Sequence, residues 1–165
     1  MDEPVVVLPY DPAWPGRFEA EAALLREILG PWITGGVHHV GSTSVPGLPA
    51  KPIIDIAVGV TDLDSTRPCI ELLAEHEYCY APYLADEMHW FCKPDPSRRT
   101  HHLHLMPTES PRFADELVFR DRLRADPTLA REYAELKLRL AEIHRDDRNA
   151  YTEAKGEFVA RAVGR

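Results

Sequence analysis

Residues 39–55 read HVGSTSVPGLPAKPIID, a segment rich in glycine, serine and proline. The apolar run of residues 53–60 begins at the end of this segment and is typical of a buried strand. Residues 33–40, which lead into the segment, are expected to form another strand. Glycine and proline interrupt regular structure, so we expect a loop over residues 41–52. The segment therefore predicts two strands joined by a loop of small residues.

This loop is suited to phosphate oxygens. Gly41 lets the backbone approach a ligand closely. Ser42, Thr43 and Ser44 offer hydroxyls, and Lys51 offers a positive charge, to phosphate oxygens. The spacing differs from that of a P-loop, and the prolines farther along lack N–H groups, so a phosphate cradle would lie within residues 41–44. The alternative is a turn whose hydroxyls bond their own backbone.

Asp55 is a single carboxylate inside the apolar run. Burying a charge costs several kcal/mol unless a cation or hydrogen-bond donors meet it, so an acid on a strand beside a polar loop is often functional. The alternative is that Asp55 anchors the loop by pairing with Lys51.

Periodicity predicts the remaining elements. Apolar residues at steps of three and four indicate an amphipathic helix over residues 16–29, ended by Gly30 and Pro31. We further expect a strand at residues 5–8, a helix at 66–75, strands at 78–83, 89–92 and 102–106, and helices at 111–124, 129–143 and 151–162. This order predicts one α+β domain over residues 1–165, with a helical C-terminal cap on its sheet.

Two histidines are candidates for metal or phosphate binding. His102 and His104 lie on one face if residues 102–106 form a strand, because side chains alternate. They would share a metal with Asp55 if the two strands are neighbours. The alternative is that each ring is partly buried and donates to the backbone.

Cations on the predicted helices are further candidates. Arg120 and Arg124 lie one turn apart and suit a phosphate or carboxylate, although an ion pair with Asp121 explains them equally. Tyr151 and Lys155 are i, i+4 neighbours that could close a pocket from the cap; the alternative is a core tyrosine covered by a lysine stem.

Residues 39–56, HVGSTSVPGLPAKPIIDI, resemble the signature of the GrpB family. Residues 10–14, 102–104, 119–124, 133–137 and 151–155 are also similar to family positions, so the resemblance covers nearly the whole chain. It implies a fold like that of polymerase-β-like nucleotidyltransferases, a mixed sheet with flanking helices and a helical cap. It also implies a ligand-binding role for the residues at matching positions, Arg120, Lys137, Tyr151 and Lys155.

The same resemblance implies a phosphate and metal site. In the wider superfamily a Gly-Ser pair holds nucleotide phosphates, and carboxylates that alternate on a strand hold Mg²⁺. Gly41, Ser42 and Asp55 occupy matching places, but Ala57 stands where the second carboxylate belongs. The carboxylate set is therefore incomplete for two-metal nucleotidyl transfer. Mg²⁺ or another divalent metal is the expected cofactor, with no organic cofactor implied.

Three hypotheses on function follow. The first is a protein that binds a small phosphorylated or nucleotide-type ligand; if it is an enzyme, Asp55, His102 and His104 would serve metal-assisted nucleotidyl or phosphoryl transfer. The second is a catalytically degenerate module with a ligand-binding or regulatory role. The third is a metal-dependent hydrolase built on the same two histidines and Asp55.

Composition narrows the classes of partner. The chain of 165 residues has 19 basic and 27 acidic residues, a formal net charge of −8, which argues against binding nucleic acid through overall charge. No apolar run approaches the ~20 residues that cross a bilayer, and the acidic start differs from a secretory signal. We expect a cytoplasmic monomer or weak dimer whose three cysteines are reduced.

Overall fold

A computed structural model describes residues 4–164 of the chain. Its centre is a five-stranded sheet of order β1-β2-β5-β4-β3, formed by Ile33–Val40 (β1), Ile54–Val60 (β2), Arg98–Pro107 (β5), His89–Asp95 (β4) and Cys79–Tyr80 (β3). β2 and β5 are parallel, and every other neighbouring pair is antiparallel. The sheet is therefore mixed, as predicted.

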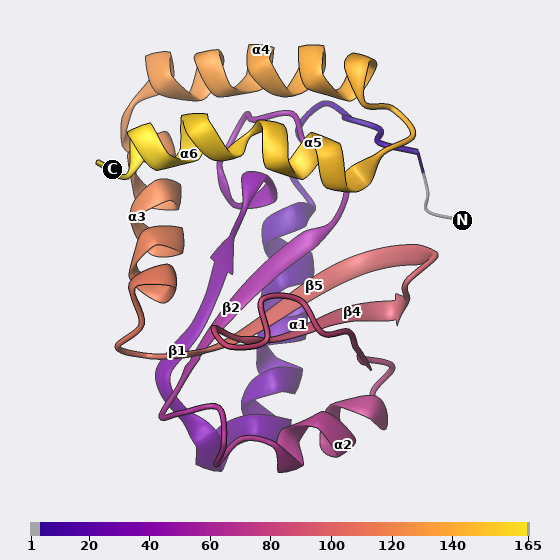
Figure 1. The fold of residues 1–165 in the computed structure, drawn as a ribbon, viewed down its shortest axis with the longest axis vertical. Coiled ribbons are helices and arrows are strands. Elements are labelled where there is room, and N and C mark those ends of the chain that lie inside the picture. Colours follow the sequence, from indigo (N-terminus) through magenta and orange to yellow (C-terminus); the bar gives the residue numbers. More distant parts are fainter. Residues whose placement is uncertain (1–3, 165) are drawn as a thin grey trace.

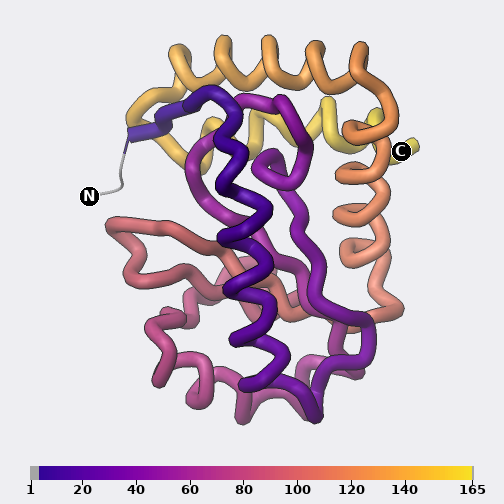
Figure 2. Tube along the Cα trace, turned by 180° about the vertical axis from the view of Figure 1, so that it is seen from behind, coloured from indigo at the N-terminus to yellow at the C-terminus, as the bar shows by residue number. Residues whose placement is uncertain are grey.

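Helices cover the sheet in two layers and close one end (Figure 1). They are α1 (Trp14–Leu29), α2 (Pro68–Ala74), α3 (Pro111–Ala125), α4 (Pro127–Ile143), α5 (Arg148–Ala154) and α6 (Gly156–Ala162). Seen from behind, α1 runs along the length of the sheet. α4 lies across one end of the molecule, the end at which the N-terminal segment also lies (Figure 2). The predicted C-terminal cap is thus formed by α4, α5 and α6.

The alternation of side chains on β2 explains how the sheet is covered. Ile54, Ile56 and Val58 join the main core beneath α1 and α2, because they point to the same face. Ala57 points to the opposite face, where it packs in a smaller core with Phe113 of α3. Asp55 lies on the same face as Ala57 but nearer the loop and the C-terminal helices, beyond the residues of this smaller core.

Most predicted elements are confirmed, and two predictions are wrong. Residues 5–8 form no strand: Leu8 makes one isolated bridge to Ala50, and Val5 packs against α4 and α5, so the segment has no neighbour to pair with over its length. The single helix predicted over residues 151–162 is divided at Lys155, directly before Gly156, whose helix propensity is low.

The limits of several strands also differ from prediction. Residues 78–83 contribute only Cys79–Tyr80, whereas β4 and β5 extend to a tight turn at Pro96 and Ser97. The sequence pattern does not predict a strand for the polar residues at the ends of β4 and β5. They belong to the sheet because the two strands pair there. Within residues 4–164, no helix has the length and apolar character needed to span a membrane.

Candidate functional site

The turn after β1 is built around the contact between Gly41 and Asp55. Gly41 has φ +72°, a conformation that side chains rarely adopt, and a Cβ there would lie 2.4 Å from Asp55 Oδ2. Ser42–Ser44 then form a short 3-10 turn. Glycine is therefore required both by the backbone conformation and by the carboxylate packed against it.

The three hydroxyls predicted to bind phosphate divide into two groups. Ser44 Oγ donates to Gly41 O at 2.5 Å, and Thr43 Oγ1 lies 2.9 Å from His39 Nε2, so both are used to hold the turn. Ser42 is partly exposed, and its hydroxyl has no hydrogen-bond partner among the residues described. Ser42 alone of the three has a hydroxyl available for a ligand.

Asp55 and His102 form a hydrogen-bonded pair across neighbouring strands. Parallel pairing of β2 with β5 sets them opposite each other, and His102 Nδ1 lies 3.1 Å from Asp55 Oδ1. Burial raises the pKa of Asp55, but the His102 hydrogen bond outweighs it, together with the charges of His102, His104 and, least, Lys51, and the pKa falls to about 2. Burial lowers the pKa of His102. A neutral imidazole thus donates to an ionised carboxylate, and His102 Nε2 is buried without a hydrogen-bond partner.

His104 has a different partner, which sequence patterns did not reveal. Its Nδ1 lies 2.8 Å from Oε1 of Glu116 on α3. Burial lowers the pKa of His104, but the charge and hydrogen bond of Glu116 outweigh it and raise that pKa above its ordinary value. The one available signal for Glu116 was its position three residues after the buried Phe113, on the side of α3 that faces the sheet.

Three of the four lysines of the chain come together at the cap. Lys51 Nζ and Lys155 Nζ lie 5.1 and 4.5 Å from the centroid of the Tyr151 ring, which is fully buried. Lys137 is 1% exposed; its Nζ donates to the carbonyl of Pro49 and lies 5.0 Å from the Tyr133 ring centroid. The loop, α4 and the α5–α6 junction each supply one ammonium group.

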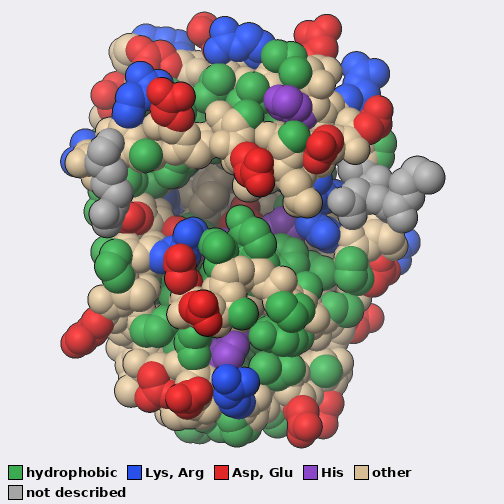
Figure 3. Space-filling view, viewed as in Figure 1, with side chains coloured by type: hydrophobic (Ala, Val, Ile, Leu, Met, Phe, Trp, Pro, Cys, Tyr) green, Lys and Arg blue, Asp and Glu red, His purple; other side chains and the backbone are tan. Residues whose placement is uncertain are grey.

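The lysine cluster is electrostatically strained. Burial, followed by repulsion from Lys155, lowers the pKa of Lys51 to about 7 and that of Lys137 to about 6. Asp55 is the acidic group that opposes both shifts. Figure 3 shows that the surface is hollowed between the C-terminal helices and the sheet, with charged and histidine side chains around the hollow. An anion bound beside these lysines would relieve their repulsion.

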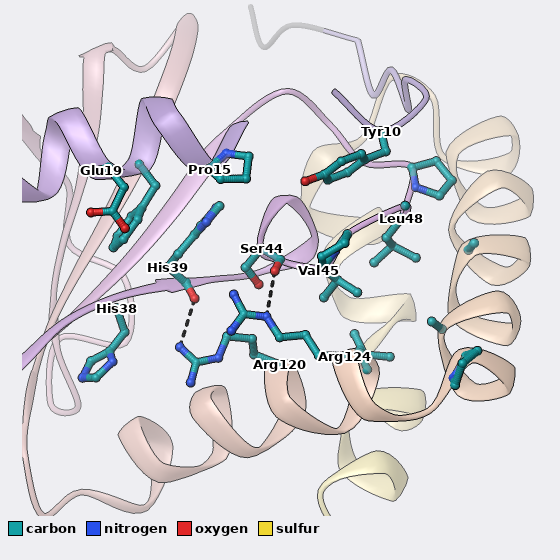
Figure 4. Close-up of a pocket in the computed structure, with 18 of the residues that line it drawn as sticks. Tyr10, Pro15, Glu19, His38, His39, Ser44, Val45, Leu48, Arg120 and Arg124 are labelled. Carbon is teal, nitrogen blue, oxygen red and sulfur yellow. Dashed lines mark hydrogen bonds between the residues drawn. The ribbon is translucent and has the colours of Figure 1, made fainter. Parts of the chain in front are cut away.

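Arg120 lies away from this cluster. Its Nη1 donates to His39 O at 3.2 Å and its Nε to Asp121 at 2.9 Å, while Arg124 Nε donates to Ser44 O at 2.9 Å (Figure 4). Both arginines hold the β1–β2 turn from α3, and both line a pocket of about 840 Å³. The predicted ligand-binding residues therefore fall into two groups, one at the lysine cluster and one on α3.

The donor atoms present do not form a metal site by themselves. Among residues 4–164, no three His, Cys, Asp or Glu side chains converge closely enough to hold a metal ion. The Nδ1 atoms of His102 and His104 face carboxylates, and Ala57 is fully buried where a second carboxylate would be needed. A metal held by protein ligands alone, as the hydrolase hypothesis requires, has no donor set in this part of the chain.

Comparisons with known proteins agree over nearly the whole chain. The model of the family described as GrpB protein matches residues 4–165. The UPF0157 protein PA4798 of Pseudomonas aeruginosa is 42% identical over 170 residues, which cover 99% of this chain and 68% of that protein. The crystal structure of the conserved protein GrpB from Enterococcus faecalis matches with a TM-score of 0.86 and 34% identity, over 96% of this chain and 94% of that one.

Two more distant matches place the fold in a wider setting. A chain in the GLD-2/RNP-8 complex matches with a TM-score of 0.50 and 14% identity, over 89% of this chain and 51% of that one. This likeness shows the fold alone, and the fold is nucleotidyltransferase-like, as predicted. A dephospho-CoA kinase of Mycolicibacterium paratuberculosis is 30% identical over 190 residues, which cover 98% of this chain and 46% of that protein.

Proposed function

Since this chain belongs to the GrpB family, we propose that it binds a nucleotide or another small phosphorylated molecule between its sheet and its C-terminal helices. The lysine cluster of Lys51, Lys137 and Lys155 is the observation that carries the proposal. Buried ammonium groups that repel one another are costly unless an anion joins them. A bound anion would favour the protonated forms of Lys51 and Lys137, whose pKa values are about 7 and about 6 in the free protein.

The groups beside the cluster suit the phosphates of such a ligand. The hydroxyl and the backbone of Ser42 lie at the rim of the turn, where Gly41 permits close approach. Lys51 and Lys155 would neutralise phosphate oxygens, and the buried Lys137 would add positive potential once the bound anion favours its protonated form.

Mg²⁺ fits this site only together with the ligand, because Mg²⁺ commonly uses one or two carboxylates and completes its shell with substrate phosphates and water. Asp55, ionised and partly exposed, would hold it, and the ion would offset the negative charge of the phosphates. For transfer chemistry, Asp55 is also the group that could accept a proton from an attacking hydroxyl.

A second candidate is a binding module without catalysis, which Ala57 favours. A two-metal site needs a second carboxylate on β2, and the methyl group of Ala57 is fully buried in the core under α3. The match to less than half of a dephospho-CoA kinase is consistent with a unit that works beside another enzyme. In this case ligand binding persists and turnover is absent.

Thermal unfolding with defined ligands tests the proposal. ATP and inorganic triphosphate should raise the melting temperature, whereas adenosine should not, because it lacks phosphates. Lys51→Met and Lys155→Met should each weaken triphosphate binding about tenfold or more. Arg139→Met is the matched control, because it removes one positive charge from the exposed side of α4.

Two outcomes would contradict the proposal. One is the absence of stabilisation by either phosphate compound, and the other is an equal loss of affinity in the Arg139→Met control. Asp55→Asn separates the metal from the phosphate: it should abolish the additional effect of Mg²⁺ and retain binding of triphosphate in EDTA. Product analysis after incubation with ATP then distinguishes an enzyme from a binding module.

A further inference from the structure

We propose that the pocket behind the β1–β2 turn is a second binding site, which takes a small organic anion with an apolar body and one carboxylate or phosphate. This rear pocket lies between the start of α1, the turn and residues 45–49, and the α3–α4 corner. Its volume of about 840 Å³ is within the ordinary range of small-molecule sites. No lysine among residues 4–164 lines it, although Pro49, whose carbonyl accepts a hydrogen bond from Lys137, does.

The wall of the rear pocket is largely apolar and firmly packed. Val45 and Leu48 from the loop and Leu123 from α3 are almost fully buried in one cluster with Tyr133 and Phe158. Ala130 and Ala134 on α4 also line the pocket, and their small side chains leave the space open. Such a wall favours a ligand with a hydrocarbon or aromatic body.

The charged groups at the rim are mostly positive. Arg120, Arg124 and Arg131 line the pocket from α3 and α4, and Figure 4 shows Glu19 on the side opposite Arg120 and Arg124. Arg120 is already paired with Asp121, but Arg124 uses only Nε, on Ser44 O. No described residue accepts a hydrogen bond from the terminal nitrogens of Arg124, so they are available to an anionic group.

The His39 imidazole on the inner wall adds no charge. His39 stacks on Phe18 with ring centroids 4.8 Å apart, and its Nε2 bonds the Thr43 hydroxyl. Burial lowers the pKa of His39 to about 4, so the ring is neutral at physiological pH. Discrimination for an anion therefore comes from the arginines that line the pocket, which include Arg26 of α1.

Calorimetric titration of the full chain with octanoate, octyl phosphate and 1-octanol tests this inference. Both anions should bind, and the uncharged alcohol should bind at least tenfold more weakly. A preference of more than tenfold between the two anions identifies the headgroup class. Arg131→Met should weaken the anions severalfold and leave octanol unchanged, because Arg131 lies at the rim, with one bond to Thr128.

A filling substitution and its control complete the test. Ala130→Phe places a ring in the rear pocket and should weaken both anions at least tenfold, whereas Ala114→Phe, at an exposed site on α3 outside the pocket, should not. Saturable binding that is equal in wild type and Ala130→Phe, octanol binding as tight as that of the anions, or no binding of either anion would each overturn the inference. Lys51→Met, which weakens phosphate binding at the first site, should bind octyl phosphate normally, so failure of the first site is distinguishable.

Discussion

Gly41 and Asp55 show how a contact between two residues determines the shape of the turn. The absence of a side chain at Gly41 leaves room for the Asp55 carboxylate, and the carboxylate in turn is held ionised by His102. The mutual dependence of these groups makes the turn sensitive to single atoms.

Gly41→Ala should destabilise the protein by about 1–3 kcal/mol, since it combines an unfavourable positive φ with a clash against Asp55. Gly47→Ala is the matched control: Gly47 has φ +82°, but a Cβ there meets no atom within 4 Å. Urea denaturation of both variants separates backbone strain from the clash. Equal destabilisation of the two would show that the contact with Asp55 is unimportant.

Lys137 should make stability depend on pH. Its pKa is about 6 in the folded protein and near its ordinary value of 10.5 when unfolded, so the unfolded chain binds more protons between these values, and stability should rise with pH. Lys51, with a folded pKa of about 7, acts in the same direction. Between pH 7 and 8, Lys137→Met should therefore reduce the rise in unfolding free energy by roughly half. This pH range lies below the ordinary pKa of cysteine, so the cysteines contribute little to the rise.

Urea denaturation of wild type and Lys137→Met at pH 7.0, 7.5 and 8.0 measures this slope. The substitution also removes the hydrogen bond to Pro49, which lowers stability by a similar amount at every pH and leaves the slope unaffected. Parallel curves for the two proteins would show that Lys137 titrates normally.

At the scale of elements, α3 supports the turn from behind. Arg120 and Arg124, one helical turn apart, hold the carbonyls of His39 and Ser44. The turn is thereby held both by these two arginines and by the contact of Gly41 with Asp55. The position of the Ser42 hydroxyl consequently depends on α3, although α3 does not contribute to the lysine cluster.

Arg124→Met should increase hydrogen exchange at the amides of residues 42–45, because it removes the bond to Ser44 O. It should also weaken triphosphate binding severalfold without altering any group in the lysine cluster. Arg122→Met, at an exposed position on the same helix, serves as the control. Unchanged exchange in Arg124→Met would mean that the turn keeps its shape without α3.

At the scale of the whole molecule, the sheet and the cap meet at the lysine cluster. Lys51 comes from the loop that leads into the sheet, whereas Lys137, Tyr151 and Lys155 belong to the cap. Neutralising this cluster should therefore stabilise the contact between the two parts of the fold.

The affinity for triphosphate should fall as pH rises above about 7. Lys51 has a pKa of about 7 in the free protein, and a bound anion favours its protonated form, so binding above pH 7 requires proton uptake. The loss should be at most about tenfold per pH unit for each lysine that takes up a proton. Calorimetry between pH 7.0 and 8.5 measures it, and Lys51→Met should flatten the profile; a constant affinity in wild type would contradict the assignment.

Local sequence was sufficient for most elements and for part of the site. Helices, strand β2 and the turn at Gly41 follow from periodicity and backbone preference, which act over a few residues. The alternation of a strand also predicted that His102 and His104 share a face. Residues 5–8 were mistaken for a strand because pairing requires a neighbour, which no local pattern reveals.

Convergence of distant side chains was decided only by the folded chain. Parallel pairing of β2 and β5 brings His102 to Asp55, and packing of the cap brings Lys137 and Lys155 to Lys51. The same packing keeps Arg120 at the carbonyl of His39, outside the lysine cluster. The physical reason is that a residue's backbone preference arises within its own segment, whereas its neighbours in space depend on how all the segments bury their apolar faces together.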